Sequence, residues 1–210
     1  SVGAGTGTVV LTNAGNNYLG VTTVKAGAIL RLGVAPGTTN SALGAQGMVS
    51  NGTVVQSGGV LDLAGFTLGQ EVVTIAGTGI GGTGALITSG NALNQAGAIK
   101  NLILSANATI GTTNTTAASQ IGISNGFIQG NGNTLTFLNS GSGGSPYIFF
   151  VNNVFDNLAG VTLSNGPNVA NIVVNNMSFG NTVLTTTGAT DIQMQKTATL
   201  GPVNLGVNAK

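Results

Sequence analysis

The side chains that could carry out acid/base or metal chemistry are few and dispersed. The acids are Asp62, Glu71, Asp156 and Asp191, five Lys and Arg residues are spread over 210 residues, and the sequence contains neither His nor Cys. Catalytic and Ca²⁺-binding sites built from carboxylates need several of them at one place, often with Arg, Lys or His. The sequence offers one such neighbourhood at most, that of Asp62 and Glu71.

Asp62 and Glu71 are near in sequence. If the chain forms coils of a repeating fold, Lys25 and Arg31 would lie one or two coils before them. An Asp between two leucines is typical of a solvated carboxylate on a strand face. We therefore predict no catalytic residue, no cofactor-binding residue and no metal ligand, and we expect that the chain is not an enzyme. Replacing Asp62 or Glu71 with Ala is then expected to leave any biological activity unchanged, apart from small effects on stability.

The composition restricts the partners of the chain. Only 4% of residues are charged and the net charge is +1, whereas nucleic acids and anionic membranes require clustered Lys and Arg. The longest bulky apolar run is Tyr147–Val151, far short of the roughly 20 residues of a membrane-spanning helix. With 25 Asn and 36 Gly residues and a mean hydropathy of +0.38, the chain is a folded protein solvated by amides and hydroxyls.

Short strands with period-two alternation dominate the sequence. Between them lie Asn-Gly and Gly-Gly pairs that supply the positive φ of sharp corners. Ala98–Ile110 has some helical spacing, but period two fits it better and places Leu102, Leu104, Ala106, Ala108 and Ile110 on one face. The clearest strands are Thr8–Thr12, Ala28–Leu32, Val60–Leu63, Thr134–Phe137 and Asp191–Gln195.

Many short strands with glycine corners are compatible with a sandwich, a barrel or a solenoid. The scarcity of aromatic residues and the small apolar residues favour the narrow core of a parallel β-solenoid. At roughly 20 to 25 residues per coil, the chain would form about nine coils, a rod of roughly 40 to 45 Å. Identical polar residues of successive coils are expected to stack into Asn or Thr ladders.

Three polar segments interrupt the pattern: Gly33–Gly47, Thr112–Gln120 and Asn139–Pro146. We interpret all three as loops that bulge from a coil, and the third is the best place for a linker. Because the apolar pattern resumes at Tyr147, residues 1–210 are predicted to form one continuous solenoid segment of a larger protein.

Residues Gly7–Leu68 resemble the autotransporter-associated β-strand repeat of the passenger domains of bacterial autotransporter-type surface proteins. The order and spacing match over three consecutive units, and Gly79–Gly111 is similar in shorter pieces. The matching pieces are Gly7–Thr12, Asn16–Leu32, Asn40–Gly44 and Gly58–Gly65.

This resemblance implies an all-β, right-handed parallel β-helix that is displayed outside the cell, at the bacterial surface. The function expected is that of a structural stalk or fibre segment that associates with itself end to end, because both ends of a solenoid expose unpaired strand edges. Two alternatives remain open: an adhesin that binds host or neighbouring surfaces through loops Gly33–Gly47 or Asn139–Pro146, and a polysaccharide-active β-helix enzyme. Because neither a signal peptide at Ser1 nor the C-terminal strands of a membrane barrel are recognised in the sequence, we expect the chain to be an excised or mature piece whose targeting signals lie elsewhere or have been removed.

Overall fold

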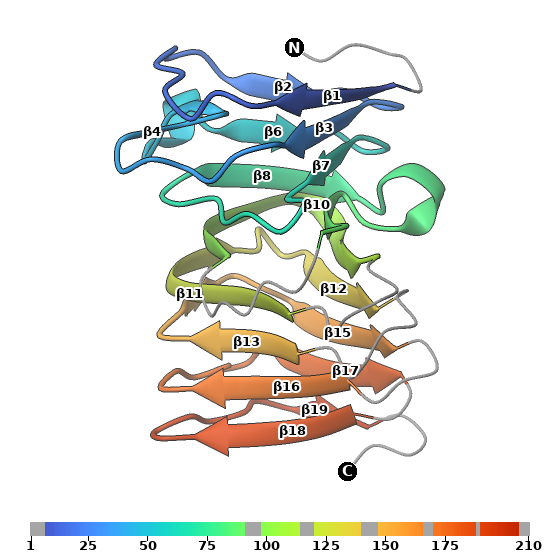
Figure 1. Cartoon of the computed structure of the whole chain (residues 1–210). Helices are drawn as coiled ribbons and strands as arrows, with labels where there is room; N and C mark the ends of the chain where they lie inside the picture. The colour runs from blue at the N-terminus through green and yellow to red at the C-terminus, as the bar shows by residue number, and fades with distance from the viewer. Residues whose placement is uncertain are drawn as a thin grey trace.

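The computed structural model describes residues 7–90, 98–113, 120–139, 147–165, 170–187 and 190–205. The described chain is all-β, apart from two single 3₁₀ turns, η1 (Val49–Asn51) and η2 (Ile80–Gly82). Every ladder of the main sheet is parallel, and the strands stack from β1 and β2 at one end to β18 and β19 at the other (Figure 1). This arrangement is consistent with the predicted β-solenoid.

The paired strands fall into three stacked columns. Column I contains β2 (Thr22–Val24), β6 (Thr53–Val55), β8 (Val72–Gly77), the first part of β10 (Ile99–Thr112), the last part of β11 (Gln120–Gln129) and β14 (Val154–Asp156). Column II contains β1 (Thr8–Leu11), β3 (Ile29–Leu32), β7 (Val60–Asp62), β9 (Leu86–Thr88), the last part of β10, β12 (Thr134–Asn139), β15 (Gly160–Asn165), β17 (Val183–Thr187) and β19 (Val203–Asn204). Column III contains the first part of β11, β13 (Tyr147–Val151), β16 (Ala170–Asn175) and β18 (Thr190–Gln195).

Column II runs along the whole rod. Column I occupies its N-terminal part and column III its C-terminal part. Column III begins at β11 in the described chain, and column I ends at β14. Further along, a single parallel bridge between Ser178 and Thr199 takes the place of a column I ladder. The cross-section of the rod therefore changes near its middle, where β10 and β11 each contribute to two columns.

Side-chain alternation explains why these segments are strands. In β12, residues at every second position are buried and the intervening ones are half-buried. The segment with partial helical spacing, Ala98–Ile110, lies almost entirely in β10, as the period-two pattern predicted. Ala106 does not share the face predicted for it with Leu104 and Ala108: it is exposed whereas they are buried, because β10 turns a corner at Ser105–Asn107 between its two columns.

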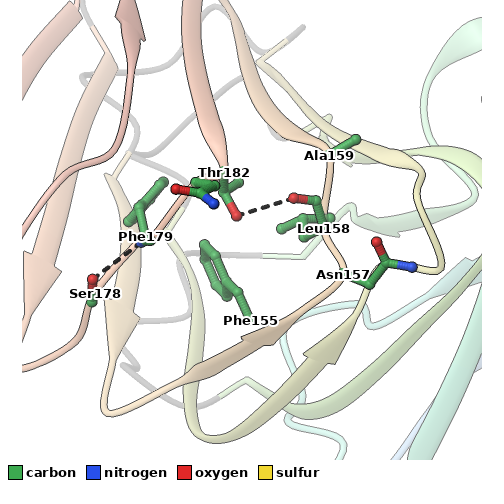
Figure 2. Close-up of a pocket in the computed structure, with 9 residues that line it drawn as sticks. Phe155, Asn157, Leu158, Ala159, Ser178, Phe179 and Thr182 are labelled. Atoms are coloured by element: carbon green, nitrogen blue, oxygen red, sulfur yellow. Dashed lines mark hydrogen bonds between the residues drawn. The ribbon is translucent and has the colours of Figure 1, made fainter.

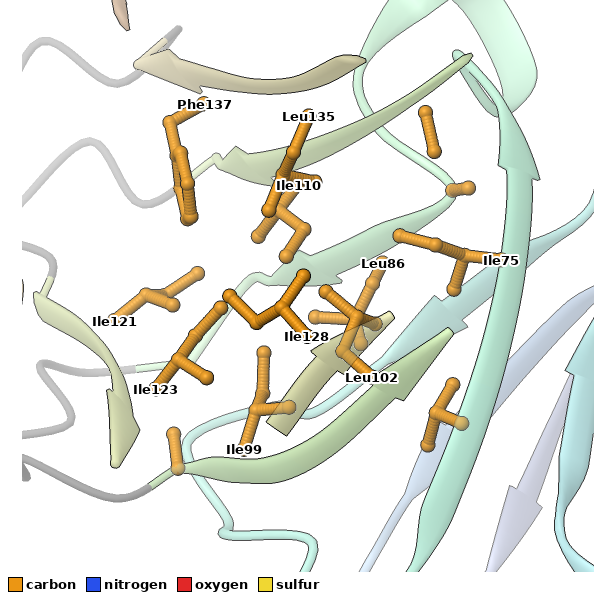
Figure 3. Packing of buried hydrophobic residues seen from close by; sticks show 14 of the residues in the cluster. Ile75, Leu86, Ile99, Leu102, Ile110, Ile121, Ile123, Ile128, Leu135 and Phe137 are labelled. Carbon is orange, nitrogen blue, oxygen red and sulfur yellow. The ribbon is translucent and has the colours of Figure 1, made fainter. Parts of the chain in front are cut away.

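The interior is one continuous apolar core formed by the inward residues of all three columns. In the middle of the rod, leucine and isoleucine side chains from β8 to β12 converge on the axis (Figure 3). Each such fully buried side chain stabilises the fold by about 1.5–3 kcal/mol. Toward the C-terminal end the core becomes aromatic: Phe150 packs edge-to-face on Phe137, Phe155 and Phe179, with ring centroids 5.5, 5.6 and 5.7 Å away.

The coils are less uniform than the sequence predicted. Side chains stacked one coil apart are separated by 20 residues for Asn175 and Gln195 but by 31 residues for Arg31 and Asp62. The predicted range of 20 to 25 residues is therefore too narrow. The long coil contains the segment Gly33–Gly47, which was predicted as a loop but includes an antiparallel hairpin of β4 (Asn40–Ser41) and β5 (Gly44–Ala45).

The predicted polar ladders are present. At one corner of the C-terminal half, the amide nitrogen of Asn152 donates to the side-chain oxygen of Asn125 (2.8 Å), and that of Asn176 donates to Asn152 (2.7 Å). All three have positive φ, between 51° and 56°, a conformation that Asn tolerates better than most residues. Lys196 occupies the same corner of the last coil with φ 54°. On column II, Thr109, Thr136, Thr162 and Thr185 pair in register.

Candidate functional site

Asp62 is not the solvated carboxylate that the sequence predicted. Its side chain is 0% exposed at the end of β7, and it accepts a hydrogen bond from Nε of Arg31 in the preceding coil at 2.7 Å. Its two oxygens also accept hydrogen bonds from the main-chain N–H of Ala64 and from the N–H and hydroxyl of Ser89. These four donors, drawn from three coils, compensate for the burial of the charge.

Glu71 is also fully buried, just before β8, but it has far fewer partners. One carboxyl oxygen accepts a hydrogen bond from the Thr53 hydroxyl at 2.7 Å, and the other has no partner among the described residues. Because Thr53 pairs with Val73, Asn51 occupies the position of the neighbouring coil that corresponds to Glu71. The Asn51 side chain is buried, and neither its oxygen nor its nitrogen has a partner in the described chain.

The electrostatics of this second cluster follow from its burial. Desolvation raises the pKa of Glu71 to about 7, against a smaller lowering by the Thr53 hydrogen bond. The neighbouring Tyr18, whose hydroxyl lies 2.8 Å from that of Thr22, has a raised pKa as well. Burial is the main cause of the Tyr18 shift, the Thr22 hydrogen bond opposes it, and the charge of Glu71 adds to it.

The structure separates the two carboxylates that the sequence grouped together. Asp62 belongs to column II and Glu71 adjoins column I, and they share no hydrogen-bond partner. Arg31 pairs with Asp62, as their spacing allowed, whereas Lys25 is exposed. Both carboxylates are buried, and the four hydrogen bonds to Asp62 support a structural role for Asp62 and Arg31.

The loops proposed as adhesive surfaces fare differently. Ala42 and Leu43, at the tip of the β4–β5 hairpin, are buried, so the Gly33–Gly47 segment is fixed on the core rather than protruding freely. Asn139 is the last residue of β12, and residues 140–146 lie outside the described chain. In the Thr112–Gln120 segment, residues 114–119 also lie outside it, and the two terminal residues belong to β10 and β11.

An open pocket that the sequence did not indicate lies at the end of column I. Figure 2 shows Phe155 between Phe179 and Leu158, with Asn157 beside them and the Thr182 hydroxyl bonded to the Leu158 carbonyl. The pocket has a volume of about 480 Å³, and no charged side chain lines it. Its lining residues are Phe155, Asn157, Leu158, Ala159, Ser178, Phe179, Gly180, Asn181 and Thr182. The Gly180-Asn181 pair, whose residue types favour turns, lies in this lining, but it was not singled out from the sequence.

Within the described ranges, no three His, Cys, Asp or Glu side chains gather into a potential metal site, and no helix has the length and apolarity to cross a membrane. Comparison with known proteins identified no relative: no family model matches the chain, and no curated protein or solved structure matches it significantly.

Proposed function

We propose that this chain is a structural segment of a longer bacterial surface protein, in which it extends a stalk or fibre and associates end to end. The proposed fold is a right-handed parallel β-helix of about nine coils, as in the passenger domains of autotransporter-type proteins that residues Gly7–Leu68 resemble. The observation that carries the proposal is column II. From β1 to β19, each of its strands pairs in parallel with the strand of the next coil.

The two ends of the rod support stacking on further coils. At the N-terminal end, Val9 of β1, which is in register with the buried Leu30, is 42% exposed, and the sequence has no charged residue before Lys25. At the opposite end, Met194 of β18 and Val203 of β19 are also exposed. An added coil would pair with the open strand edges and cover these apolar side chains.

One observation favours adhesion as a second candidate function. Large apolar side chains are exposed in the segments that precede and follow the β4–β5 hairpin in the sequence, and the hairpin packs against Tyr18. Clusters of exposed apolar residues are typical of protein interaction sites. The exposed residues are Tyr18, Leu19, Val21, Met48 and Val49.

The test compares Val9→Lys, at the end of the rod, with Val154→Lys, on its side. Sedimentation velocity and negative-stain electron microscopy of the wild type should show concentration-dependent, end-to-end rods. Val9→Lys should abolish them, because the buried junction would contain an uncompensated charge, whereas the Val154→Lys protein, changed at a side chain that is 65% exposed, should still form them.

Antibody labelling of intact cells tests the location. Surface labelling is expected. Monomers at all concentrations, equal assembly of both variants, or labelling only after the cells are opened would contradict the proposal.

A further inference from the structure

The outward face of column II is a regular array of hydroxyl groups in the C-terminal half of the rod. β12, β15 and β17 lie next to one another along the rod (Figure 1) and pair in parallel without a break in register. Because alternate residues of these strands are buried in the core, the residues between them point outward. Thr136 pairs with Thr162, and Thr162 pairs with Thr185, so these three outward side chains form one row across three coils.

Each of the three coils carries a second outward hydroxyl, two residues from the Thr136–Thr162–Thr185 row. These second hydroxyls belong to Thr134, Ser164 and Thr187. Thr109 continues the row in the preceding coil, but it is only 6% exposed, so the accessible part of the row begins at Thr136.

The hydroxyls of the row are not used by the fold. Thr136, Thr162 and Thr185 are half-buried, as expected in the middle of a sheet, and their hydroxyls have no hydrogen-bond partner among the described residues. The same is true of Ser164, whereas the Thr187 hydroxyl donates to the Leu163 carbonyl at 3.1 Å. The row therefore presents its donors and acceptors to whatever lies against the face.

The backbone sets the spacing of this array in two directions. Adjacent coils of a parallel sheet are roughly 4.7–4.9 Å apart, and residues two apart on one strand are separated by about 6.6 Å. Thr is branched at Cβ and has few χ1 rotamers, so a row of Thr in one backbone conformation repeats the same arrangement of methyl and hydroxyl groups. Water molecules bound to the row are held at the same spacings.

The composition of the face indicates its ligand. Its remaining outward positions are Leu138, Gly160 and Val183, so the three strands present neither a charge nor an aromatic ring on this side. A charged ligand would find no counter-charge there, and the apolar faces of sugar rings pack best on exposed aromatic side chains. A flat, neutral, two-dimensional repeat of hydroxyl and methyl groups instead matches a crystal that is itself a neutral lattice of hydrogen-bonding oxygens.

We propose that the outward face of β12, β15 and β17 binds the surface of ice. The row of Thr136, Thr162 and Thr185 orders water at the spacing of the coils, and this water continues into the crystal, whose oxygen rows repeat on a similar scale. The binding does not depend on end-to-end stacking, because the face lies on the side of the rod and not at its ends. Every further coil that extended the row would add contacts with the same lattice.

The test grows ice slowly in a stirred solution of the purified chain and measures the fraction of protein that enters the ice. The shape of single ice crystals held just below the melting point is recorded in parallel. The wild type should be enriched in the ice relative to an inert protein, which the freezing front pushes ahead of it, and it should give faceted crystals.

Three variants locate the face. Thr162→Tyr raises a ring at its centre and keeps the neighbouring coils from reaching a flat lattice, so enrichment should fall at least tenfold. Thr136→Lys should have a similar effect, because an ammonium group holds its own hydration shell. Thr74→Tyr is the matched control: Thr74 is a half-buried outward residue of β8 in column I, and its replacement should change enrichment less than twofold. Circular dichroism of each variant verifies that the fold is retained.

Four results would overturn the proposal. They are exclusion of the wild type from ice, equal effects of Thr162→Tyr and Thr74→Tyr, and two cases in which ice growth is unaffected. In the first of these, the chain adsorbs to microcrystalline cellulose or chitin and Thr162→Tyr abolishes the adsorption, which would assign the face to a solid polysaccharide. In the second, Thr162→Tyr abolishes a side-by-side dimer in sedimentation velocity, which would make the face an interface between two copies of the chain.

Discussion

Raising the pH from 4.5 to 8 is expected to destabilise the rod through Glu71. The folded protein holds this carboxyl in a fully buried position and raises its pKa from the ordinary 4.5 to about 7. Below pH 4.5 the group is protonated in both the folded and the unfolded chain, and the stability that it contributes is fully present. Between pH 4.5 and 7 the unfolded chain releases the proton first, which favours unfolding.

The size of the effect follows from the pKa difference. Each pKa unit corresponds to 1.36 kcal/mol, so the free energy of unfolding should fall by roughly 3 kcal/mol between pH 4.5 and 7 and then level off. For a chain of this length, such a change lowers Tm by roughly 6–12 °C. Glu71→Gln is the matched control, because the amide keeps an oxygen for the Thr53 hydroxyl and does not titrate.

The assay is thermal unfolding followed by circular dichroism at pH 4.5, 6 and 8. At pH 4.5 the wild type and Glu71→Gln should unfold within a few degrees of each other, and at pH 8 the variant should be more stable by roughly 3 kcal/mol. Amide hydrogen exchange at Thr53–Val55 should show the same dependence locally. The reasoning is refuted if Glu71→Gln loses stability with rising pH as steeply as the wild type does.

Three further changes test the ion pair and the corner ladder, each by urea or thermal unfolding. Asp62→Ala should destabilise the fold by about 3 kcal/mol or more, not by the small amount expected from the sequence, because it leaves Arg31 and the buried donors of Ala64 and Ser89 unpaired. Arg31→Ala should cost less, since the carboxylate keeps its other donors, and equal costs would contradict this. Asn152→Ala should lower the free energy of unfolding by about 2–3 kcal/mol, because two hydrogen bonds are lost and Ala is unfavourable at this positive φ. Asn152→Gly should be about 1 kcal/mol more stable than Asn152→Ala, because Gly adopts this φ freely. Equal stability of the two variants would exclude the backbone contribution. Lys196→Gly should stabilise the last coil by about 1 kcal/mol by relieving its positive φ, and a lower Tm would show that the lysine side chain matters more.

Local patterns predicted the strands and corners well. Period-two alternation identified β10 and β12, and the Asn-Gly pair at Asn125 marked a corner where a side chain at Gly126 would collide with the main-chain oxygen of Lys100. The polar ladders followed from the abundance of Asn and Thr in a parallel stack. These features depend on neighbours in sequence or on the parallel register alone, which is why composition and spacing predict them.

Features that depend on which coil lies above which were not predictable in the same way. The burial of Asp62 results from Arg31, 31 residues earlier, and Ser89, 27 residues later, and neither spacing is a regular repeat. Without the coil lengths, an Asp between two leucines could not be distinguished from a solvated one. The β4–β5 hairpin lengthens one coil and conceals the repeat at that place.

The pocket was missed for a related reason. It arises because column I ends while column II continues, and this requires comparing three coils at once. The four clustered phenylalanines come from β12, β13, β14 and the turn at Phe179, so no local window of sequence shows that they meet. Residue types and the period-two alternation therefore predict the strands that form the sides of the rod. They do not predict the end of a column or a cluster of side chains from several coils, which create the pocket.

The stacking of coils along one axis determines how the rod responds to mechanical load. Hydrogen bonds between coils lie parallel to the axis, so a pulling force acts on one ladder after another. The strand β19, which pairs with β17 only through Leu184 and Thr185, detaches before β18, which pairs with β16 over six positions. Each detached coil exchanges about 4.8 Å of rod for the extended length of 20 to 31 residues, roughly 70 to 100 Å of chain. A fibre of such coils lengthens in steps under tension and absorbs work at each step, while the remaining coils keep their structure.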